Sequence, residues 1–231
     1  MESLRDSFES SRQPFAAGAS AVETPVDGFL GGPFSLERVA YVYLFEESRS
    51  PNEIIEIRRV RALRDGASTF GLSLRNTESD DFGLDQQVLW GGSLTTTKGA
   101  TADGGATHWR RIDFGRTLRA GQSHEFALRT WIEVDPEPQT EVCFGVTVPA
   151  REVSIHLGFH GSPQPSEAWR YGPLPDESAI PKTPSGGRRV KIIGNSVSAT
   201  FRNPVSGPIY GLAWRWTRQP ANGSRGPQRR L

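Results

Sequence analysis

Four histidines are present, and two of them, His156 and His160, lie close together in the sequence. On a helix, this H-x-x-x-H spacing would place both imidazoles on one face, as a metal site requires. The surrounding sequence is typical of a β-strand, where a separation of four residues places the rings about 13 Å apart, too far to share one ion. We therefore expect no metal and no cofactor. A turn at Gly161 would shorten the gap, so a metal site stays open as the alternative.

Nucleophilic and hydrolytic chemistry has less support. The sequence contains no G-x-S-x-G turn and no glycine-rich phosphate motif. The one cysteine, Cys143, lies in a strand-like segment, where a cysteine is more often a small core residue than a nucleophile. We therefore favour a protein with no catalytic residues. A hydrolase acting on a carbohydrate or an ester, with His156, His160 and loop carboxylates as acid–base groups, is the alternative.

Aromatic residues beside arginines are the strongest remaining indication of binding. The chain has six tryptophans, and several of them neighbour an arginine. Within His124–Val134, Trp131 and Arg129 fall on the face opposite the regular apolar one. An exposed tryptophan beside an arginine is a candidate platform for a ligand or a partner protein. The predicted binding surface consists of Arg129, Trp131, His156, Trp169 and Arg170.

The elements that must position these residues are predicted to be strands. Alternation of apolar and polar residues predicts about 11–13 short strands between residues 34 and 217, with no long helix. This pattern predicts an all-β fold, an antiparallel β-sandwich in one domain. The clearest half-buried strand is His124–Val134. Val153–Phe159 and Ile209–Trp216 also alternate, and their apolar residues are expected to face the core: Val153, Ile155, Leu157, Phe159, Tyr210, Leu212, Trp214 and Trp216.

Two strands depart from simple alternation. Leu36–Glu46 is apolar on both faces, which predicts a central strand or one that the N-terminal tail also covers. In Ile54–Leu63, the apolar positions change phase after Ile57, and a bulge near Arg58 and Arg59 would restore it.

Composition limits the remaining classes. Lys and Arg number 27 against 26 Asp and Glu, which argues against a general nucleic-acid-binding surface. No apolar run approaches the roughly 18 residues that span a bilayer, and the single cysteine favours a reduced, cytoplasmic setting. Residues 1–33 are predicted to form an N-terminal tail, and residues 218–231 a basic disordered tail. The expected partner is a protein or a small-molecule ligand.

Four segments from residue 54 onward form a series: IIEIRRVRALRDG, RTLRAGQSHEFALRT, REVSIHLGFHGSPQPSEAWRY and SVSATFRNPVSGPIYGLAWRW. This series resembles the β-rich C-terminal region of Xre-type helix-turn-helix regulators of high-GC bacteria. The resemblance implies a sensor or assembly module that binds a ligand or a partner protein, without known catalytic residues. No helix-turn-helix precedes the strands in this sequence, so DNA binding does not carry over. A jelly-roll component of a shell or virion is a further alternative.

Overall fold

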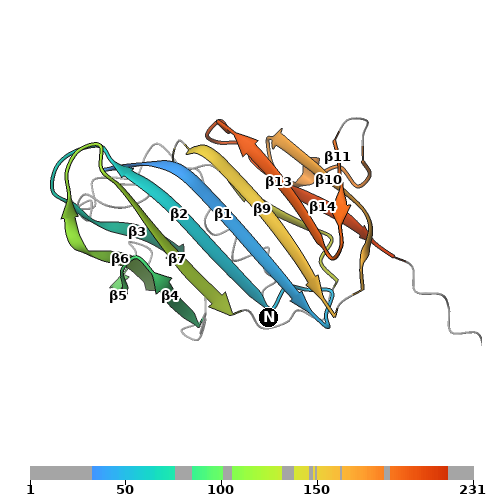
Figure 1. Ribbon diagram of the computed structural model, residues 1–231, viewed down its shortest axis with the longest axis horizontal. Helices are drawn as coiled ribbons and strands as arrows, with labels where there is room; N and C mark the ends of the chain where they lie inside the picture. Colours follow the sequence, from blue (N-terminus) through green and yellow to red (C-terminus); the bar gives the residue numbers. More distant parts are fainter. Residues whose placement is uncertain are drawn as a thin grey trace, which may run out of the picture.

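The computed structural model is an all-β sandwich built on one seven-stranded sheet (Figure 1). It describes residues 33–75, 85–100, 106–131, 138–145, 148, 150–161, 163–184 and 188–217. Neighbouring strands of the large sheet are antiparallel, apart from β1 and β9, which run parallel. The spatial order of this sheet is β12 (Ile192–Ile193), β13 (Ser196–Arg202), β9 (Ala150–His160), β1 (Phe34–Glu46), β2 (Glu53–Ala62), β7 (Ser123–Trp131) and β4 (Gln86–Trp90).

Two smaller sheets cover one face of the large sheet, side by side. In Figure 1, β10, β11 and β14 lie behind the side that carries β9 and β13, whereas β3, β5 and β6 lie on the side of β7. We call the covered side of the large sheet the inner face and the opposite side the outer face. The four-stranded sheet has the order β11 (Arg189–Val190), β10 (Pro165–Leu174), β14 (Ile209–Trp216) and β8 (Glu141–Gly145), and the three-stranded sheet the order β3 (Ala67–Arg75), β6 (Ala106–Leu118) and β5 (Ser93–Ala100).

Aromatic side chains hold the layers together. Phe45 of β1 stacks on Phe159 of β9 with ring centres 4.8 Å apart, and Trp214 of β14 meets Phe45 edge-on at 5.5 Å. At the other end, Phe70 of β3 lies 5.4 Å from Phe126 of β7. The predicted core is confirmed, because every residue named for it is buried: Val153, Ile155, Leu157, Phe159, Tyr210, Leu212, Trp214 and Trp216.

The phase change in β2 has a different cause from the predicted bulge. β2 pairs with β7 in continuous register, and the irregularity lies in β1, at Glu37. β2 therefore keeps its alternation and directs Glu56 and Arg58 to the inner face, where they form an ion pair. The Arg58 guanidinium also lies 5.3 Å from the centre of the Phe70 ring. The prediction of a bulge at Arg58 and Arg59 was wrong because the fold accommodates a charged pair under the junction of the two small sheets.

Tyr41 lies beside this ion pair and provides a test in alkaline solution. Burial, with a smaller contribution from Glu56, raises the pKa of Tyr41 to about 12. The unfolded chain therefore loses the phenol proton near pH 10 while the folded protein keeps it, so the free energy of unfolding falls as the pH rises from about 10 to 12. We expect Tyr41→Phe to reduce that slope by up to about 1.4 kcal/mol per pH unit. Urea titrations at several pH values measure it, and an unchanged slope would contradict the assignment.

Two predictions concern segments outside the described residues. These are the N-terminal tail through residue 32 and the basic tail 218–231. Within the described ranges, no helix is long and apolar enough to cross a membrane.

Candidate functional site

The outer face of the large sheet is the candidate functional site. Alternate residues of each strand point to this face, and strand pairing aligns them in rows. Both small sheets lie on the inner face, so no described strand packs over the outer one. At its centre, five side chains of β1 and β2 form a continuous aliphatic band, and all but Ala40 remain partly exposed. The aliphatic band consists of Ala40, Val42, Leu44, Ile55 and Ile57.

A fixed aromatic corner borders the band on the β7 side. Arg129 lies opposite Ile55, and its guanidinium is 5.4 Å from the centre of the Trp131 ring. The Nε of Arg129 lies 2.8 Å from the Glu53 carboxylate, with which it forms an ion pair. Trp131 is 37% exposed, and Trp90 of β4, on the same face, is 44% exposed. The ion pair and the cation–π contact restrict the arginine, so this corner presents aromatic surface at low entropic cost.

A neutral polar group borders the band on the β9 side. His156 pairs with Val42, and its Nδ1 lies 2.9 Å from the Ser198 hydroxyl. Its Nε2 lies 3.2 Å from the hydroxyl of Ser154. Partial burial lowers the pKa of His156, so the ring is mainly neutral at pH 7. A neutral imidazole donates from one nitrogen and accepts at the other, which suits the two serines.

A row of charges crosses one end of the outer face. Pairing places its members on five adjacent strands, each opposite the next. The charged row, from β7 through β2, β1 and β9 to β13, consists of Glu125, Arg59, Arg38, Glu152 and Arg202.

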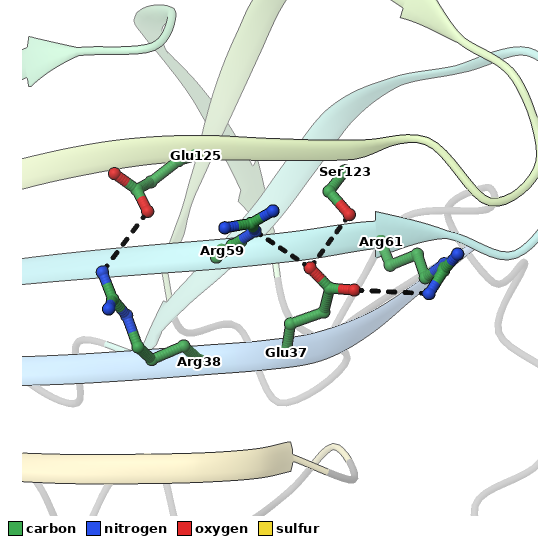
Figure 2. A network of polar contacts seen from close by, with 6 residues as sticks. All are labelled: Glu37, Arg38, Arg59, Arg61, Ser123 and Glu125. Atoms are coloured by element: carbon green, nitrogen blue, oxygen red, sulfur yellow. Dashed lines mark hydrogen bonds and ion pairs between the residues drawn. The ribbon is translucent and has the colours of Figure 1, made fainter.

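The irregularity in β1 holds part of this row in place (Figure 2). The carboxylate of Glu37 accepts from Arg59 Nε at 3.0 Å and from the Ser123 hydroxyl at 2.9 Å, with Arg61 at 3.5 Å. Arg38 lies 3.5 Å from Glu125 on β7. Because the extra residue of a bulge re-aims a side chain, Glu37 and Arg38 both reach the outer face, between the buried Leu36 and Val39.

The predicted binding residues separate into three groups. Arg129, Trp131 and His156 share the outer face. Trp169 is only 3% exposed, and its indole N–H donates to the Pro181 carbonyl at 2.9 Å in a small core on the far side of β10, so it does not belong to that surface. Arg170 is exposed, but it comes from β10, and its guanidinium contacts the Thr200 carbonyl at 3.4 Å.

The centre of this surface was not predicted from the sequence. The prediction of a central strand is confirmed, because β1 is the middle strand of the large sheet. What was not predicted is that the second apolar face of β1 stays partly exposed and continues onto β2, where the phase change was interpreted as a bulge. Trp90 was also missed, because its strand is short and contains an irregularity before that residue.

Within the part of the chain that the structure describes, His156 and His160 do not form the catalytic or metal arrangements considered above. Two serine hydroxyls occupy the ring nitrogens of His156, whereas a triad needs a carboxylate to orient the imidazole. His160 contacts Asn195 instead, at 3.1 Å. Among the described residues, no group of three His, Cys, Asp or Glu side chains comes together as a metal site.

The shape of the surface favours a macromolecule over a small ligand. Arg129 and His156 lie three strand spacings apart, about 14 Å, with only the aliphatic band between them. A small molecule is usually held in a concave site that covers most of its surface. A broad sheet face with an apolar centre and a polar edge has the composition of a protein interface.

No protein-family model and no curated protein matches the chain. The resemblance to the β-rich region of Xre-type regulators therefore stays a prediction.

Proposed function

We propose that this protein is a non-enzymatic interaction module that binds a protein partner through the outer face of its large sheet, in a sensor or assembly role. The observation that carries the proposal is the aliphatic band, partly exposed on the two central strands. The centre of a large sheet is where a sandwich normally buries most apolar surface, so a partly exposed band that no described strand covers favours a binding role.

The surroundings of the band support the same role. Trp131 and Arg129 are residue types that dominate binding energy at interfaces, and here they lie at its edge in a fixed geometry. The charged row supplies a polar boundary along one end. The partner that fits is a protein surface with an apolar centre and charges of both signs at its rim.

Val42→Arg tests the proposal in an extract of the cells that make the protein. We expect the wild-type chain to elute from a sizing column in a complex larger than its own 25.4 kDa. Val42→Arg should elute at the size of the free chain, because a cation in the apolar centre of an interface costs at least about tenfold in affinity.

Val205→Arg is the matched control, since Val205 is an exposed valine in the loop before β14. It should leave the complex unchanged. Val42→Thr keeps the shape of valine and adds one polar hydroxyl group. A weaker complex with Val42→Thr would show that polarity at position 42, and not misfolding of the arginine variant, causes the loss of the complex. The proposal fails if the wild-type chain elutes alone, or if Val42→Arg elutes with the complex.

A further inference from the structure

We infer that one partner of this face is a second copy of the chain, in a two-fold symmetric dimer. The inference rests on the proposed function, because it names the occupant of the same surface. A two-fold interface uses one patch twice, so the patch must complement itself. The charged row meets that requirement, and so does the part of the aliphatic band that lies on β1.

The order of signs in the charged row carries the argument. From β7 to β13 the row reads Glu125, Arg59, Arg38, Glu152, Arg202. A two-fold axis that lies in the interface and runs along β1 reverses this order in the second copy. Glu125 then faces Arg202 of the other copy, and Arg59 faces Glu152. Four of the five positions therefore meet an opposite charge, each contact occurring twice.

The same axis places the β1 part of the aliphatic band on itself, and it places Ile55 and Ile57 of β2 opposite His156 and Ser154 of the other copy. Val42 and Leu44 of β1 lie on the axis and meet their own counterparts, while Ala40 completes the strip. Arg38 and Glu37, both on β1, also approach their own counterparts near the axis. These like-charge approaches are eased within each copy, because Arg38 lies 3.5 Å from Glu125 and Glu37 accepts from Arg59 at 3.0 Å. Aligned packing of two sheets with strands nearly parallel is a common arrangement of β-layers.

The size of the face limits the affinity. The proposed contact area is five strands wide and extends along the strands from the charged row to Leu44. This gives an area on the order of 500 Å² on each copy. The total of roughly 1,000 Å² is at the lower limit for specific association. We therefore expect a reversible dimer with a dissociation constant in the micromolar range.

Light scattering and sedimentation of the purified full chain, from about 1 to 200 µM, test the dimer. The mass should rise from 25.4 kDa toward twice that value as the concentration increases. Val42→Arg should stay at 25.4 kDa throughout, Val42→Thr should dimerise more weakly, and Val205→Arg should behave like the wild type. A wild-type mass of 25.4 kDa at every concentration, or a dimer that Val42→Arg leaves intact, would overturn the inference.

A charge exchange tests the axis itself. Glu125→Arg and Arg202→Glu each place like charges opposite one another in a homodimer, so each variant alone should dimerise at least about tenfold more weakly. An equimolar mixture of the two variants should form a mixed dimer with nearly the affinity of the wild type. In that dimer the two altered side chains face each other with opposite charges, and the unaltered Glu125 and Arg202 form the second contact as in the wild type. A mixture no tighter than either variant alone would rule out this arrangement.

The two proposals fail separately. If the purified chain is monomeric while the complex in extracts still depends on Val42, the partner is another protein, and only the dimer is refuted.

Discussion

Glu56→Ala is expected to lower the free energy of unfolding by about 3 kcal/mol. Glu56 points to the inner face, where it pairs with Arg58 beneath the ring of Phe70. Removal of the carboxylate leaves the guanidinium largely buried without its counter-charge, and breaking a buried pair typically costs about 3–5 kcal/mol. The lower end applies here because both side chains keep a little under one-fifth of their surface exposed.

The double variant Glu56→Leu/Arg58→Met separates the charge effect from packing. With both charges replaced by apolar side chains of similar volume, we expect stability within about 1 kcal/mol of the wild type. Urea unfolding of the wild type, of Glu56→Leu, of Arg58→Met and of the double variant completes the double-mutant cycle. Additive losses in the double variant would show that the two side chains act independently and would contradict the pairing.

Gly91→Ala is expected to cost about 3 kcal/mol, through the turn that moves the chain from the large sheet to the three-stranded one. Gly91 has φ +82°, and a Cβ there would lie 2.2 Å from the Glu125 carbonyl oxygen and 2.7 Å from Phe126 Cα. The substitution therefore adds a backbone clash to the strain of a left-handed conformation.

Gly66→Ala is the matched control, because Gly66 has φ +88° but nothing within 4 Å of the added carbon. It should cost only about 1 kcal/mol, the strain alone. Urea midpoints compare the two variants, and equal losses would show that the close approach at Gly91 does not contribute.

The fold class followed from the sequence wherever a strand has one buried face. β9 and β14 alternate cleanly, and their apolar residues are the core. β1 and β2 could not be interpreted in this way, because both of their faces carry apolar residues. The small sheets cover only one of these faces, and alternation in the sequence does not show which one. Coverage depends on the placement of two small sheets from distant parts of the chain, and no local pattern encodes it. The same holds for the parallel pairing of β1 with β9, which joins strands more than a hundred residues apart.

The candidate site was predicted in part. The alternation of residues along β7 predicted that Arg129 and Trp131 share one face. The structure confirms this, because the Arg129 guanidinium lies 5.4 Å from the centre of the Trp131 ring. Trp169 has the same kind of neighbours in the sequence, but the segment around Pro181 covers it, which is a tertiary contact. The aliphatic band was missed because exposed aliphatic residues in a strand have the same pattern as buried ones.

Site-specific photo-cross-linking most directly tests whether the outer face is the functional surface. A photoreactive residue replaces Val42 in one full-length chain and Val205 in another, and both are irradiated at equal concentration, purified and in extract. We predict discrete protein adducts from position 42, among them a species of twice the chain mass, and none above background from position 205. Equal yields at the two positions, or no adduct from position 42, would contradict a binding role for this face.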